Sequence, residues 1–156
     1  MEQCQSNKSM EDFKIKNYTN QSPNKKFPFY RQLSVEDMEF LRKKISFNFG
    51  FEDEDDGLRL VKFLEIKARL LENINADTKD FKLNKVFQQI NISPQRNIYL
   101  DWYRFDKTDS MFWDDLCGYF NEIWYPGPDD ISIFDQSLLW IVFVSHEGYI
   151  SYLKKI

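Results

Sequence analysis

The adjacent carboxylates Asp129 and Asp130 are the side chains of this sequence with the clearest potential for chemistry. They follow a Pro-Gly-Pro break in the stretch WYPGPDDISIFD, residues 124–135. Carboxylates that converge with Asp135 or Glu147 could hold a divalent cation that activates water for hydrolysis. Neighbouring strand residues point to opposite faces, so the pair can share an ion only if Asp129 still belongs to the turn. The pattern favours turn capping, and a cation-dependent hydrolase site near Asp129, Asp130 and Asp135 is the rival interpretation.

The single histidine, His146, limits the metal and acid–base chemistry available to the chain. One histidine excludes zinc sites built on several histidines, and no nucleophile motif lies beside it. The pattern His146-Glu147-Gly148 predicts a turn with an exposed imidazole of ordinary pKa. An acidic loop at residues 52–57 has calcium-like spacing, but Phe63 stands where an EF-hand needs a bidentate Glu. The leading interpretation therefore has no catalytic residue, no metal ligand and no cofactor.

The net charge of −4 is unevenly distributed along the chain. Residues 1–32 carry +3, residues 33–96 carry −1 and residues 97–156 carry −6. All four tryptophans lie in that acidic last third. Because duplex binding depends on cationic contacts to phosphate, this charge disfavours a nucleic-acid partner. An acidic, aromatic surface favours a basic protein partner instead.

The cysteines and the apolar segments of the sequence indicate the cellular compartment of the protein. Cys4 and Cys117 are too few for a disulfide framework, which fits a reducing compartment. The amino-terminal residues lack the basic start and apolar run of a signal peptide. No segment has the roughly 20 apolar residues that span a bilayer. We expect a cytoplasmic protein without a membrane partner, and the sequence predicts no oligomeric state.

The hydrophobic pattern predicts an α+β fold, with N-terminal helices packed on a C-terminal antiparallel sheet of about four strands. Residues 1–30 are rich in Asn, Gln, Ser and Lys, and they predict a flexible tail. Residues 31–156 then form a single α+β domain. The expected helices cover residues 35–48, 58–74, 78–90 and 111–123, and the expected strands cover residues 97–105, 129–135, 138–145 and 149–153.

The last quarter of the chain contains a series of short motifs on an aromatic and acidic background. They are Trp124-Tyr125-Pro126, Asp129-Asp130, Ile133-Phe134-Asp135, Trp140 and His146-Glu147-Gly148. In these motifs, residues 119–155 resemble the C-terminal part of a family of small, uncharacterised bacterial cytosolic proteins. The resemblance implies a bacterial cytosolic protein and assigns no activity. Small acidic α+β proteins of this kind are also similar in size and charge to bacterial immunity proteins, which neutralise toxins.

These observations predict a non-enzymatic protein-binding module, of the immunity type, that docks a basic partner through an acidic, aromatic face. Tyr and Trp rings add contact area to such a face at little entropic cost. The predicted partner-binding residues are Asp101, Asp106, Trp124, Tyr125, Asp129, Asp130 and Glu147. The hydrolase described above and a self-associating structural domain are the other two hypotheses.

Overall fold

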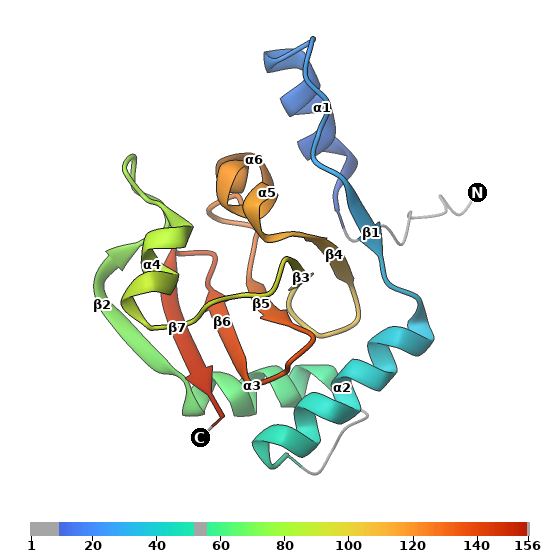
Figure 1. The fold of residues 1–156 in the computed structure, drawn as a ribbon, viewed down its shortest axis with the longest axis vertical. Coiled ribbons are helices and arrows are strands. Elements are labelled where there is room, and N and C mark those ends of the chain that lie inside the picture. The colour runs from blue at the N-terminus through green and yellow to red at the C-terminus, as the bar shows by residue number, and fades with distance from the viewer. Residues whose placement is uncertain (1–9, 52–55, 156) are drawn as a thin grey trace.

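The structure, a computed structural model, describes residues 10–51 and 56–155. A seven-stranded antiparallel sheet forms its centre, in the order β1-β4-β3-β5-β6-β7-β2, with helices on both faces (Figure 1). The strands are β1 (Tyr30–Gln32), β2 (Arg69–Asn75), β3 (Asn97–Asp101), β4 (Thr108–Phe112), β5 (Ile131–Asp135), β6 (Trp140–Val144) and β7 (Tyr149–Lys154). The helices are α1 (Asp12–Gln21), α2 (Val35–Phe49), α3 (Gly57–Lys67), α4 (Leu83–Gln89), α5 (Trp113–Gly118) and α6 (Phe120–Ile123).

Strand β6 lies near the middle of the sheet, between β5 and β7. All five of its residues are buried, as the continuous apolar run of residues 138–145 predicts for a strand covered on both faces. The expected strands at β3, β5, β6 and β7 are therefore confirmed, and so is the α+β class.

Helix α2 begins and ends at the residues that its sequence indicates. The Ser34 side chain accepts a hydrogen bond from the Asp37 N–H at 3.1 Å, which caps the first turn. Gly50 ends the helix in the left-handed conformation, with φ of 78°. Between these caps, the apolar stripe of Met38, Leu41 and Ile45 is buried against the sheet.

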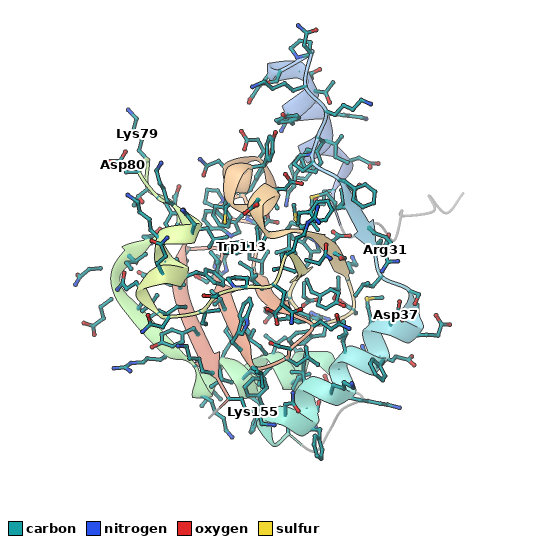
Figure 2. All side chains as sticks on the ribbon, in the orientation of Figure 1. Arg31, Asp37, Lys79, Asp80, Trp113 and Lys155 are labelled. Atoms are coloured by element: carbon teal, nitrogen blue, oxygen red, sulfur yellow. The ribbon has the colours of Figure 1, made fainter. Side chains whose placement is uncertain are left out.

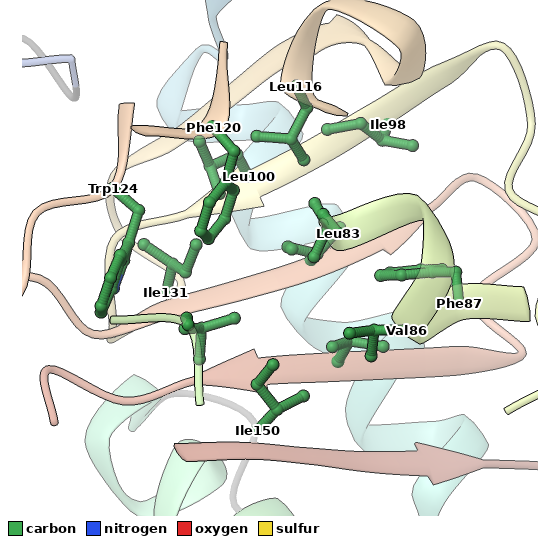
Figure 3. Close-up of a cluster of buried hydrophobic side chains, with 14 of the residues drawn as sticks. Leu83, Val86, Phe87, Ile98, Leu100, Leu116, Phe120, Trp124, Ile131 and Ile150 are labelled. Carbon is green, nitrogen blue, oxygen red and sulfur yellow. The ribbon is translucent and has the colours of Figure 1, made fainter. Parts of the chain in front are cut away.

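Each face of the sheet has its own hydrophobic core. Helices α4, α5 and α6 pack on one face, where Leu83, Phe87, Leu116 and Phe120 meet strand residues such as Ile131 (Figure 3). Helices α2 and α3 cover the other face (Figure 1). Burial of many large apolar side chains on both faces supplies most of the driving force for folding.

The sheet is larger than the sequence pattern predicts, and the helices are not all N-terminal to it. Leu70, Leu71 and Ile74 fit a helical spacing, yet they belong to β2, an edge strand paired with β7. The pattern is ambiguous because β2 is irregular: its register shifts between Leu70 and Asn75, and Asn73 has φ of 63°. Tertiary pairing overrides helical periodicity here.

Strand β4 is another strand that the hydrophobic pattern does not predict. Residues 108–112 are polar at Asp109 and Ser110, which suggested a helix cap before residue 111. The chain instead pairs with β3 and with β1, and the helix begins only at Trp113. The Asp109 carboxylate accepts a hydrogen bond from the Trp102 indole at 3.0 Å, so its polarity is satisfied by a tertiary contact.

The N-terminal segment differs from the predicted flexible tail of residues 1–30. Residues 1–9 lie outside the described residues, but residues 12–21 form α1, which projects beside β1 and α6 (Figure 1). Lys14 and Tyr18 of this helix are buried, and so is Met10 just before it, at spacings of four residues. The acidic loop at residues 52–55 also lies outside the described residues.

We predict that Gly57→Ala destabilises the fold. A β-carbon at this first position of α3 would lie 1.9 Å from the Arg104 carbonyl oxygen, so the helix and the β3–β4 loop would have to separate. The expected loss is about 1–3 kcal/mol in the free energy of unfolding, measured by urea denaturation. Gly118→Ala is the matched control, because a β-carbon there meets no atom within 4 Å. Equal stability of the two variants would refute the close approach.

Candidate functional site

Asp129 is an interior residue that holds α1 on the body of the protein. Its carboxylate lies 2.5 Å from the Lys14 ammonium, and the side chains are 4% and 0% exposed. The same oxygen accepts the Tyr125 N–H at 2.8 Å, while the Asp129 carbonyl accepts the Trp124 indole N–H at 3.0 Å. The Pro-Gly-Pro turn is thus closed by Asp129 and connected to a helix more than a hundred residues earlier.

Aromatic rings complete the surroundings of the Lys14 ammonium. It lies 4.0 Å from the centroid of Trp102 and 5.2 Å from that of Tyr125. Burial lowers the pKa of Lys14, and the hydrogen bond to Asp129 opposes the decrease. The rings and the carboxylate together compensate the lost hydration of the cation.

Asp130 points to the other side of the turn and meets His146 in the β6–β7 turn. One carboxylate oxygen of Asp130 accepts the His146 backbone N–H at 2.8 Å and lies 3.0 Å from its Nδ1. The Nε2 atom lies 3.6 Å from the Glu147 carboxylate. The bond to Asp130 raises the pKa of His146, with a smaller increase from Glu147, so the predicted ordinary pKa is wrong.

Asp130 and His146 form the rim of a hollow of about 340 Å³ between α3 and the ends of β5, β6 and β7. Glu65 of α3 also lines it, as do the rings of Tyr103 and Tyr149. Burial raises the pKa of Glu65, and the neighbouring negative charge of Asp130 raises it further. The hollow therefore combines carboxylates, tyrosine rings and one imidazole.

The strand sequences explain why this hollow is open. Ser132 of β5, Phe143 of β6 and Ser151 of β7 are direct cross-strand neighbours, so their side chains share one face of the sheet. Phe134 lies two residues along β5 on that same face and packs in the core under α2 and α3. Small serines on either side of Phe143 leave space where larger apolar residues would fill it.

Asp101 fixes the loop that carries Tyr103 into the hollow. It is fully buried and accepts hydrogen bonds from the Phe105 N–H and the Thr108 hydroxyl, both at 2.8 Å. Burial raises the pKa of Asp101 to about 7, and those two hydrogen bonds oppose the increase. The loop is tight, with φ of 101° at Tyr103 and 55° at Phe105, so Asp101 stabilises a constrained turn.

The side chains of Asp129, Asp130 and Asp135 are each engaged in contacts within the protein. Both ring nitrogens of His146 face carboxylates, so its contacts among the described residues pair it with no nucleophile. Asp129 is bound to Lys14, and Asp135, at the far end of β5, accepts hydrogen bonds from Gln95 and Ser137. Within the described part of the chain, no three His, Cys, Asp or Glu side chains form a cluster suited to a metal ion.

The predicted partner-binding residues separate into buried and accessible ones. Asp101, Trp124 and Asp129 are buried and have internal hydrogen-bond partners, so they shape the structure and offer no contact surface in this fold. Tyr125 is partly buried against Lys14. The remaining residues, Asp106, Asp130 and Glu147, keep accessible surface.

Sequence reasoning did not select Lys14, Glu65, Tyr103 or His146 for this region. The spacing of Met10, Lys14 and Tyr18 was the one available signal for a docked helix, and a lysine on the buried side obscured it. Glu65 and Tyr103 carry no sequence signal for this hollow, because the packing of α3 and of the β3–β4 loop on the sheet brings them near Asp130.

Comparison of the chain with protein families, with curated proteins and with solved structures finds no match. Among the described residues, no helix is both long and apolar enough to cross a membrane.

We predict that Lys14→Met lowers the free energy of unfolding by about 3–5 kcal/mol, because it leaves the Asp129 carboxylate buried without its cation. Adding Asp129→Asn should recover part of that loss, since Asn still accepts the Tyr125 N–H. Urea denaturation measures both effects. Lys16→Met, at an exposed position of the same helix, is the control and should be nearly neutral. A Lys14→Met protein as stable as the control would contradict a docked α1.

We predict that the His146 pKa, followed by its ring proton resonances in NMR, lies above the ordinary value of 6.5. Asp130→Asn should lower it more than Glu147→Gln does, because the hydrogen bond to Asp130 is the larger cause. The charged pair then contributes stability below the unfolded-state pKa, and that contribution is lost as the pH rises through the folded-state pKa. An unchanged pKa in Asp130→Asn would show that the contact does not form in solution.

Proposed function

We propose that the protein is a non-enzymatic binding module of a bacterial cytosol, of the immunity type, which docks a basic protein partner. The docking surface is the hollow between α3 and the ends of β5, β6 and β7, where Asp130 and Glu65 face the rings of Tyr103 and Tyr149. Glu147, exposed in the adjoining turn, adds negative charge at its rim.

One observation carries this proposal: carboxylates and tyrosine rings from different elements line the same hollow. A lysine or arginine side chain is the natural occupant, because its cation can pair with Asp130 and Glu65 while its stem packs on a ring. The volume of about 340 Å³ exceeds what one such side chain fills, so the neighbouring residues of the partner also enter.

Charge would contribute mainly to the rate of association. The C-terminal residues 97–156, which supply most of the hollow, have ten acidic and four basic side chains. An acidic surface of this kind attracts a cationic partner over about 10 Å at an ionic strength of 0.1 M. His146 reduces that attraction when it is protonated, so the docking is expected to be weaker at acidic pH.

A tetra-arginine peptide serves as the probe, at pH 8, where a smaller fraction of His146 is protonated than at neutral pH. We predict saturable NMR shifts of the amides of Tyr103, His146 and Tyr149, with several-fold weaker binding in 200 mM than in 20 mM salt. Asp130→Asn and Glu65→Gln should each weaken binding several-fold, because each removes one negative charge from the hollow.

Asp80→Asn is the control for this titration, because Asp80 is an exposed carboxylate in the loop before α4 and does not line the hollow (Figure 2). It should bind the peptide like the unmodified protein. The proposal fails if the shifts spread evenly over all acidic surfaces, or if Asp130→Asn and Asp80→Asn bind equally. A basic protein recovered from the native organism with the unmodified chain, but not with Asp130→Asn, would identify the partner.

A further inference from the structure

A second, larger hollow of about 600 Å³ lies over the other end of the sheet, where β1, β4 and β3 run side by side. Its lining includes Arg31, Arg96, Tyr99 and Ser110, together with the side chains of Gln95 and Gln136. Every one of these residues is basic or neutral. In a chain of net charge −4, a hollow without a carboxylate in its lining is a marked local departure.

The strand register explains why Arg31 belongs to this hollow. Arg31 of β1 pairs with Ser110 of β4, and Ser110 pairs with Tyr99 of β3. Directly paired residues project to the same face, so the guanidinium, the hydroxyl and the ring form one row across three strands. Tyr99 pairs in turn with Phe134, which places the row on the face that α2 and α3 cover only in part.

Arg96 reaches the same face from the residue before β3. Its guanidinium carbon lies 5.0 Å from the centroid of the Phe112 ring. Phe112 stands two residues after Ser110 in β4, so its ring projects to the face of the row. Stacking on an aromatic ring restricts an arginine to one orientation and leaves its outer N–H groups free to donate.

Neither arginine is neutralised by the part of the chain that the structure describes. The ion pairs within residues 10–51 and 56–155 involve Lys14, Arg59 and His146, and include neither Arg31 nor Arg96. Asp37 of α2 lines a smaller adjoining hollow together with Arg31 (Figure 2). It forms no ion pair with Arg31 in the described structure, so both guanidinium groups can accept an external anion.

We propose that this hollow is a binding site for a small ligand that carries a phosphate or carboxylate group on a planar or apolar body. Guanidinium groups bind both oxyanions through paired N–H donors. Ser110, Gln95 and Gln136 offer further polar groups, and the Tyr99 ring forms a wall for the body of the ligand. The volume is within the range of small-molecule sites. The site is separate from the acidic hollow and does not depend on the function proposed for it.

Four probes separate the contributions of the anionic group and of the aromatic ring to binding: phenyl phosphate, benzoate, benzamide and inorganic phosphate. The measurement is the NMR shift of the Arg31 and Arg96 side-chain Nε–H groups in the full chain, at constant ionic strength. We expect saturable shifts with phenyl phosphate or benzoate, weaker ones with inorganic phosphate and none with benzamide. The tighter of the two aromatic anions identifies whether phosphate or carboxylate is preferred.

Arg31→Gln and Arg96→Gln should each weaken binding about tenfold, because each removes one charge-assisted donor pair. Arg31→Lys keeps the positive charge but loses the paired N–H donors of the guanidinium group. Its affinity should lie between that of the unmodified protein and that of Arg31→Gln. Arg69→Gln, an exposed arginine on β2 at the opposite edge of the sheet, is the control and should change nothing. The proposal is overturned if no aromatic anion binds, if benzamide binds equally well, or if both arginine variants bind like the control. Each variant changes an exposed side chain, so an unchanged melting temperature verifies the fold.

Discussion

The buried contact between Lys14 and Asp129 is the constraint on which the arrangement of the acidic region depends. A lysine without exposed surface is rare, and here it is held by one carboxylate and the faces of two rings. The contact attaches α1 to the turn after α6 and fixes the direction of Asp129. The next residue, Asp130, reaches the β6–β7 turn and pairs with His146. Of the two adjacent carboxylates, Asp129 thus holds α1 on the body of the protein, and Asp130 contacts the β6–β7 turn.

The partial cover of one sheet face produces two hollows of opposite character. Helices α2 and α3 pack over the middle of that face, where Phe134 and Ile141 form the core. Beyond them, the β5–β7 ends carry the acidic hollow with Asp130, and the β1–β4–β3 end carries the basic hollow with Arg31. Small or polar side chains occupy strand positions in both places. One hollow is therefore lined by carboxylates and the other by arginines, on the same side of the sheet.

Much of the central fold could be predicted from the sequence. The apolar run of β6 and the cap at Ser34 are local signals that tertiary contacts reinforce. The edge strands β1 and β2 and the inner strand β4 could not be predicted, because they are short, irregular or polar, and their identity comes from pairing with other strands. The acidic site was predicted only in part: Asp130 was selected from its sequence context, whereas Glu65 reaches the same hollow through tertiary packing alone.

The most direct test of this account compares the free energy of unfolding of Asp129→Asn with that of Asp130→Asn, by urea denaturation under identical conditions. The two changes remove the same charge from neighbouring residues, so composition cannot explain a difference between them. Asp129 is buried against Lys14, and its substitution should cost about 3 kcal/mol or more. Asp130 is partly exposed, and its substitution should cost about 1 kcal/mol or less. Equal losses, or a larger loss for Asp130→Asn, would contradict the division of roles between the two aspartates.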